Sequence, residues 1–228
     1  MSDLNWEDKE NQFLNLVTSK GHEGGYVSAE KAEELNDPGG ETNYGISRKF
    51  LKLAYKGGED GKLFKGKTGS EIDLKTLSKE DAHTIYKDEF LKATRSNYGK
   101  NEFAFKMADI AINAGAGIGT EIMQRSLRDM GEEISADGFM GDETTKAFKQ
   151  IYNNPQLRNV LMNNIIKHQE SYYTGEGETF KTKNISKDVG KNFQGGWNKR
   201  AKKTFKDIMN NDVVGHVLNS DISDNFLA

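Results

Sequence analysis

Two short stretches near the N-terminus place carboxylic acids beside glycines. They are Glu-Gly-Gly-Tyr at residues 23–26 and Asn-Asp-Pro-Gly-Gly-Glu-Thr-Asn-Tyr-Gly at residues 36–45. Glu23 follows a helical pattern that Gly21 ends, and the partial negative charge of a helix C-terminus disfavours ionisation of a nearby carboxyl. Partial burial beside Tyr26 would also disfavour ionisation of the Glu23 carboxyl. A carboxylic acid that stays protonated near neutral pH is what cleavage of a glycosidic bond requires, because the leaving oxygen must receive a proton.

The second stretch is dense in turn-forming residues, so it is expected to be a loop or a short strand. Such a turn brings a second carboxylate and a hydroxyl back towards Glu23. The spacing alone is equally compatible with an exposed glutamate that caps a turn.

Other motifs in the sequence do not indicate a binding site. Residues 115–120, Gly-Ala-Gly-Ile-Gly-Thr, resemble a phosphate-binding loop but follow a helical pattern, and a threonine replaces the final glycine, so a tight turn between helices is favoured. Residues 137–143, Asp-Gly-Phe-Met-Gly-Asp-Glu, depart from a calcium loop at Gly138 and Phe139. The four histidines lack the spacing of metal ligands. We therefore expect neither a metal nor a cofactor.

Composition limits the classes of function. The chain has 228 residues, no cysteine and a net charge of −3, with both signs mixed along its length. Thiol catalysis and disulfide scaffolds are excluded, and no basic surplus favours nucleic acid as a partner. No apolar run reaches the ~18 residues that a membrane span needs, and the N-terminus does not have the pattern of a signal peptide.

Helical periodicity dominates, and sustained strand alternation is absent, so the expected fold class is mainly α with at most a small β element. Ser78 and Asp81 form a predicted capping box. Residues 101–114 are apolar nearly all round, which predicts a buried central helix. The expected helices are 6–20, 47–55, 78–97, 101–114, 118–130, 142–153 with Asp142 as cap, 155–173 and 197–209.

The two glycine-rich stretches closely resemble glycoside hydrolase family 108, the phage-type N-acetylmuramidases. The resemblance continues through residues 109–115, Gln124, residues 137–144 and residues 193–200. It implies a helical, lysozyme-like fold in which Glu23 is the catalytic acid. It also implies a peptidoglycan-binding region after the catalytic part.

The same resemblance suggests further site residues. Asp37 and Thr42 match positions that surround the water opposite the acid, with Glu41 as a competitor for the second carboxylate. Tyr26 and Tyr44 are expected to stack on sugar rings or simply to pack. Two further residues, Asn113 and Gln124, either bind substrate or are buried polar groups that support their neighbours. Three other acids are expected to form a solvated face: Glu30, Glu33 and Glu34.

The expected organisation is a catalytic region at 1–100, a helical region at 101–209 packed with it as one unit, and a tail at 210–228. The expected activity is hydrolysis of the β-1,4 bond between N-acetylmuramic acid and N-acetylglucosamine. A lytic transglycosylase and a non-catalytic wall-binding or secretion-accessory protein are the alternatives. As an endolysin, the monomeric protein would stay in the host cytoplasm without inserting into the membrane. A holin-type pore would then release it to its partner, the peptidoglycan of the cell wall.

Overall fold

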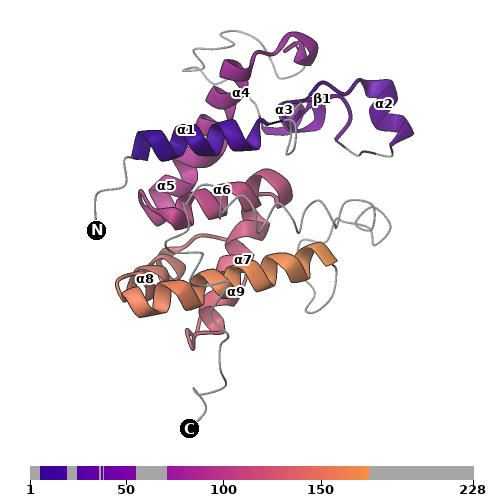
Figure 1. Ribbon diagram of the computed structural model, residues 1–228. Helices are drawn as coiled ribbons and strands as arrows, with labels where there is room; N and C mark the ends of the chain where they lie inside the picture. Colours follow the sequence, from indigo (N-terminus) through magenta and orange to yellow (C-terminus); the bar gives the residue numbers. More distant parts are fainter. Residues whose placement is uncertain (1–5, 20–24, 36, 38, 55–70, 175–228) are drawn as a thin grey trace. The chain divides into compact units, whose positions relative to one another are not determined.

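The structure, a computed structural model, describes residues 6–19, 25–35, 37, 39–54 and 71–174. These residues are mainly helical with one small sheet, which confirms the predicted fold class (Figure 1). None of the helices in these ranges is long and apolar enough to cross a membrane.

The chain divides into two compact units. The N-terminal unit falls within residues 10–89, and the C-terminal unit falls within residues 90–228 and 1–9. The expected boundary near residue 100 and the packing of both regions as one cooperative unit stay predictions.

The elements follow one another in the order of their labels. The helices are α1 (Trp6–Val17), α2 (Ala29–Glu34), α3 (Arg48–Ala54), α4 (Lys79–Tyr86), α5 (Lys92–Tyr98), α6 (Glu102–Ala114), α7 (Ala116–Arg128), α8 (Asp142–Tyr152) and α9 (Pro155–Thr174). A 3-10 turn, η1 (Leu74–Thr76), precedes α4, and a π-helical turn, η2 (Lys87–Leu91), joins α4 to α5. The strands β1 (Thr42–Asn43) and β2 (Ile46–Ser47) pair antiparallel.

Most expected helices are present within a few residues of their predicted ends. The capping box is confirmed, since the Ser78 hydroxyl accepts from the Asp81 N–H at 3.0 Å and the Asp81 carboxylate accepts from the Ser78 N–H at 3.3 Å. The helix that begins there is interrupted by η2, which periodicity does not reveal. The expected helix at 197–209 lies outside the described residues.

The start of α8 corrects the sequence analysis. Gly141 is the N-cap, and Asp142 is the first helical residue and makes no capping hydrogen bond. A glycine is a good N-cap because it adopts extended backbone at little cost. Asp142 and Glu143 instead place negative charge at the positive end of the helix, which is favourable.

In the N-terminal unit, buried side chains hold the small hairpin against a neighbouring segment. The amide of buried Asn43 donates to the Leu74 carbonyl at 2.7 Å, and Arg48 Nη1 donates to the Ile72 carbonyl at 2.7 Å. The hydroxyl of buried Tyr86 donates to the Tyr44 carbonyl at 2.7 Å. Burial raises the pKa of Tyr86, so its hydroxyl stays a donor at all physiological pH values.

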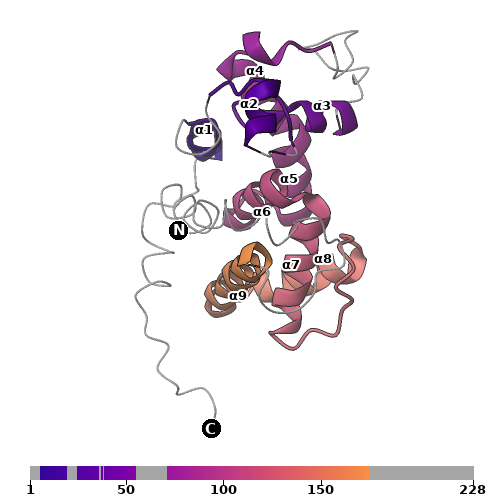
Figure 2. The ribbon, with the colours of Figure 1, turned by 90° about the vertical axis from the view of Figure 1, so that its right-hand side faces the viewer.

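In the C-terminal unit, α6 is buried along most of its length, as its apolar pattern predicts. Every residue from Phe103 to Ala111 is buried. The helix packs on α5 and α7, and α7 packs in turn on α9 (Figure 2). Asn101 caps its start by accepting from the Phe103 N–H at 3.0 Å, and Gly115 ends it with a φ of +91°. A tight turn between helices is therefore present, but it is confined to Gly115: residues 116–120, predicted as part of the turn, already belong to α7.

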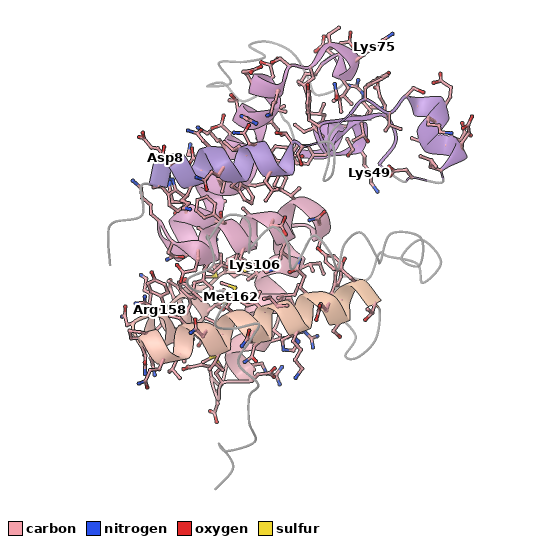
Figure 3. All side chains as sticks on the ribbon, in the orientation of Figure 1. Asp8, Lys49, Lys75, Lys106, Arg158 and Met162 are labelled. Carbon is pink, nitrogen blue, oxygen red and sulfur yellow. The ribbon has the colours of Figure 1, made fainter. Side chains whose placement is uncertain are left out.

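The buried face of α6 contains two opposite charges. Lys106 and Asp109 are both nearly inaccessible to solvent, and Figure 3 places Lys106 and Met162 of α9 in the interior of this unit. Burial lowers the pKa of Lys106 and raises the pKa of Asp109, while the attraction between the two charges opposes both shifts. Glu170 of α9 also favours the charged form of Lys106. The charges therefore stabilise each other in a place where either alone would be costly.

We predict that Asp109→Leu lowers the free energy of unfolding of the full chain by about 3 kcal/mol, because it removes a charge that compensates the buried ammonium. The double variant Lys106→Met/Asp109→Leu should recover most of this loss, since both charges are then absent. Urea denaturation followed by circular dichroism measures both. A double variant as unstable as the single one would contradict the coupling between Lys106 and Asp109.

Candidate functional site

The segment after Glu-Gly-Gly-Tyr pairs with the Gly-rich stretch. Glu23 itself lies outside the described residues, whereas Tyr26 and Val27 are described. The Val27 N–H donates to the Thr42 carbonyl at 2.7 Å, and the Thr42 N–H donates to the Val27 carbonyl at 3.0 Å. This isolated antiparallel bridge places the end of the first motif directly beside the second motif.

The Gly-rich stretch ends in a tight hairpin. Asn43 pairs with Ile46, so Tyr44 and Gly45 form a two-residue turn with φ values of +49° and +77°. Positive φ at both positions defines the type of turn that matches the twist of antiparallel strands. Glycine adopts it freely, but tyrosine does so at a cost. The hydrogen bond from Tyr86 to the Tyr44 carbonyl helps to hold this conformation.

Glu41 is engaged in an ion pair inside this loop. Its Oε2 accepts from Arg48 Nη2 at 2.8 Å and from Arg48 Nε at 3.1 Å, and both side chains are 19% exposed. Its Oε1 accepts from the Tyr26 hydroxyl at 2.9 Å, and this hydrogen bond raises the pKa of Tyr26. Glu41 therefore acts as a structural anion that ties the two motifs to α3.

Asp37 has fewer hydrogen-bond partners than Glu41 among the described residues. Its Oδ1 accepts from the Gly39 N–H at 2.8 Å, which forms a local turn. Within the part of the chain that the structure describes, its Oδ2 has no hydrogen bond, and the residue is partly exposed. Asp37 thus keeps an oxygen for a water or a substrate, which favours it over Glu41 as the second carboxylate.

The other predicted site residues of this unit differ in their hydrogen bonds and in their exposure to solvent. The Thr42 hydroxyl donates to the Gly40 carbonyl at 2.8 Å, which leaves its oxygen as an acceptor. The ring of Tyr26 is 40% exposed, and Tyr44 is partly exposed. The three competing acids are exposed on α2, in agreement with the solvated face expected for them: Glu30, Glu33 and Glu34.

Gln124 lies in the C-terminal unit and is only 1% exposed. Its Nε2 donates to Asp137 Oδ1 at 2.8 Å, to the Phe139 carbonyl at 3.0 Å and to Thr144 Oγ1 at 3.1 Å. Its Oε1 accepts from the Gly138 N–H at 2.8 Å. This placement favours the alternative that the sequence left open, a buried polar residue that supports its neighbours. We call residues 137–141, which it holds, the Gln124-bound loop.

Two further sequence candidates have local roles in this unit. Asn113 is partly buried, and its Nδ2 donates to the Asp109 carbonyl one turn earlier at 2.9 Å, so its Oδ1 stays available as an acceptor. Asp137 accepts from the Phe139 N–H at 2.9 Å as well as from Gln124. Across the described ranges, no group of three or more acidic or histidine side chains is arranged to hold a metal ion.

Sequence reasoning missed Arg48 as the partner of Glu41. The signal was present in the two-residue turn at Tyr44-Gly45. A hairpin closed there places Thr42 opposite Ser47 and hence residue 41 beside residue 48. The Arg48 N–H indeed donates to the Glu41 carbonyl at 2.8 Å.

Comparison with known proteins gives a family match for each of two successive segments of the chain. Residues 18–115 match the family model of glycosyl hydrolase 108, and residues 118–202 match that of the predicted peptidoglycan domain. No curated protein matches the chain. The solved structure of Brucella abortus SagA has a TM-score of 0.62 and 21% identity, and the match covers 89% of this chain and 94% of that chain. This likeness shows a shared fold.

The Gln124-bound loop gives a stability prediction. Gly138 has a φ of +79°, and a Cβ there would stand 2.9 Å from the Gly117 carbonyl oxygen of α7. Gly131 has a φ of +93°, with nothing within 4 Å of its Cβ position. We expect Gly131→Ala to cost about 1 kcal/mol from backbone strain alone and Gly138→Ala to cost distinctly more, because it adds a clash with backbone. Equal losses in thermal or urea unfolding would contradict the close approach of this loop to α7.

Proposed function

We propose that this chain, whose residues 18–115 belong to the glycosyl hydrolase 108 family, is an N-acetylmuramidase. Its substrate is the β-1,4 bond between N-acetylmuramic acid and N-acetylglucosamine in peptidoglycan. The family match supports a glycoside hydrolase, and the predicted peptidoglycan domain that follows supports peptidoglycan as the partner. The observation that carries the proposal for the site is the backbone bridge between Val27 and Thr42, which joins the two carboxylate-bearing motifs.

The proposed chemistry uses one carboxylic acid and one carboxylate. Glu23 donates its proton to the glycosidic oxygen as the bond from C1 of the N-acetylmuramic acid unit to that oxygen breaks. Asp37, with Thr42 beside it, orients a water that adds to C1 and takes up the proton which that water loses. Asp37 Oδ2, which has no hydrogen bond among the residues that the structure describes, and the acceptor capacity of the Thr42 hydroxyl suit that task.

Hydrolysis is distinguished from the transglycosylase alternative by its products. A muramidase leaves reducing N-acetylmuramic acid ends, whereas a lytic transglycosylase closes a 1,6-anhydro ring and uses no water. The Asp37 carboxylate, which has no ion pair within the described ranges of the chain, favours hydrolysis. Mass spectrometry of fragments released from purified peptidoglycan decides between them, and anhydro ends would overturn the muramidase proposal.

The finer biological role that we propose is that of a phage endolysin. It extends the resemblance to phage-type muramidases, and it includes release to the wall through a holin-type pore. This role requires the muramidase activity but adds nothing to the chemistry of the site.

Glu23→Gln is predicted to abolish the loss of turbidity of a peptidoglycan suspension while the protein stays folded. The amide is nearly isosteric with the acid but cannot donate the required proton. Glu33→Gln is the matched control, because it makes the same change at an exposed position on α2. A folded Glu23→Gln protein that clears the suspension at the normal rate would show that Glu23 is not the acid.

Asp37→Asn is predicted to lower kcat by at least about 100-fold at an unchanged melting temperature. The amide oxygen of asparagine can still accept from the Gly39 N–H, so the local turn survives. Glu41→Gln should do the opposite: it weakens the ion pair with Arg48 and lowers stability by about 1 kcal/mol, but it keeps most of kcat. Initial rates at equal folded concentration measure both. A greater loss of kcat in Glu41→Gln would mean that Glu41 is the second carboxylate.

A further inference from the structure

Phe139 is unusually exposed for a large apolar side chain. Its exposed fraction is 73%, compared with 51% for Leu35, 46% for Val160 and 40% for Tyr26. A phenylalanine in this position contributes little to the folded core. Single exposed apolar residues are common on protein surfaces, so the surroundings of this ring must decide whether it has a function.

The backbone that carries Phe139 is firmly held. The Phe139 carbonyl accepts from Gln124 Nε2 at 3.0 Å, and the Phe139 N–H donates to Asp137 Oδ1 at 2.9 Å. The preceding Gly138 N–H donates to Gln124 Oε1 at 2.8 Å. Both polar groups of the Phe139 backbone are therefore fixed from within the protein, in large part through a buried amide that makes four hydrogen bonds. A binding residue held in advance in this way loses little entropy when a ligand arrives.

The setting of the ring leaves it open to a ligand. Its Cδ1 atom lies only 3.6 Å from where a Cβ of Gly141 would stand, so the ring borders a residue without a side chain. Asp142 and Glu143, the next two residues of the chain, are exposed in the first turn of α8. The ring thus combines open apolar surface with nearby hydrogen-bond acceptors.

These features match the chemistry of a neutral sugar. One face of a pyranose ring is made of C–H groups, which suit the negative face of an aromatic ring. The hydroxyl and N-acetyl N–H groups around its rim are donors that carboxylates accept. The negative charges of Asp137, Asp142 and Glu143 disfavour the anionic carboxyl groups of a peptide stem.

We propose that Phe139 is a stacking platform for an N-acetylated sugar of the peptidoglycan glycan strand, held in place by Gln124 as a positioning residue. The assignment rests on the proposed function, because it takes peptidoglycan as the partner. It deepens that function by naming the sugar, rather than the peptide, as what this surface of the C-terminal unit binds.

The test is cosedimentation of the full chain with purified peptidoglycan sacculi at low temperature, which gives an apparent Kd. Phe139→Ala and Phe139→Leu should each weaken binding about tenfold, since both remove the aromatic face and leucine keeps the apolar character. Phe139→Tyr should bind like the unmodified protein. Val160→Ala, which truncates another exposed apolar residue of the same unit, is the control and should also leave the Kd unchanged.

Three outcomes distinguish a failure of the peptidoglycan proposal from a failure of the stacking platform and from a failure of the sugar assignment. If the unmodified protein does not bind sacculi, the peptidoglycan proposal itself fails. If it binds but Phe139→Ala or Phe139→Leu binds equally well, the stacking platform is wrong and the proposed enzyme stands. Competition identifies the ligand. A neutral oligosaccharide of N-acetylglucosamine should reduce the difference in apparent Kd for sacculi between the unmodified protein and Phe139→Ala. A free stem peptide that does this while the oligosaccharide does not would overturn the sugar assignment.

Discussion

The paired backbones of Val27 and Thr42 hold the two carboxylate-bearing motifs of the N-terminal unit against each other. Val27 directly follows Glu-Gly-Gly-Tyr, and Thr42 lies inside the Gly-rich stretch. Their two hydrogen bonds, at 2.7 and 3.0 Å, fix the separation of segments that the chain itself would allow to drift apart. The mechanism that we propose, with an acid on the first segment and a water-orienting carboxylate on the second, requires this pairing to persist, because catalysis depends on positions held to within a fraction of an ångström.

The two acids of the Gly-rich stretch have different partners within this arrangement. Glu41 adjoins Thr42, so the pairing brings it within reach of both the Tyr26 hydroxyl and the Arg48 guanidinium. Its Oε2 is occupied by Arg48 and its Oε1 by Tyr26, so both carboxylate oxygens already have protein partners. Among the described residues, Asp37 accepts a short-range backbone hydrogen bond through Oδ1, and its Oδ2 has no partner. Both acids belong to one short loop in the sequence, and their partners distinguish them.

Local signals were sufficient to predict most of the helical fold. The capping box at Ser78, the apolar run of α6 and the proline at the start of α9 each act through short-range chemistry. The missed elements have weaker patterns, although Ser28 caps the start of α2. The helix α2 has six residues and buries only Ala32, so it shows no periodic stripe. The π-helical turn η2 is a change in backbone hydrogen bonding that leaves the residue pattern of a helix intact.

The candidate site was harder to predict because its roles depend on contacts between distant residues. The sequence around Gln124 does not show whether its side chain faces a ligand or the protein interior. Only its hydrogen bonds to residues 13 to 20 positions later show that its amide is used inside the fold. In the same way, the exposure of Phe139 follows from the path of the Gln124-bound loop and not from its residue type. The sequence therefore predicted which segments carry the candidate residues, while the partners of each side chain required the structure.

The exposed aromatic rings of the two units are held in different ways, and this difference affects what each can bind. Tyr26 is tied through its hydroxyl to Glu41, so a ligand that moved its ring would break a hydrogen bond to a charged group. Phe139 has no polar tip, and all of its hydrogen bonds are made by its backbone. A ligand that covers the Phe139 ring removes apolar surface from water without breaking any of these bonds, so the gain is not offset by a lost polar contact. The ring of Tyr26 therefore suits a fixed position beside Glu41, whereas that of Phe139 suits the stacking contact that we propose.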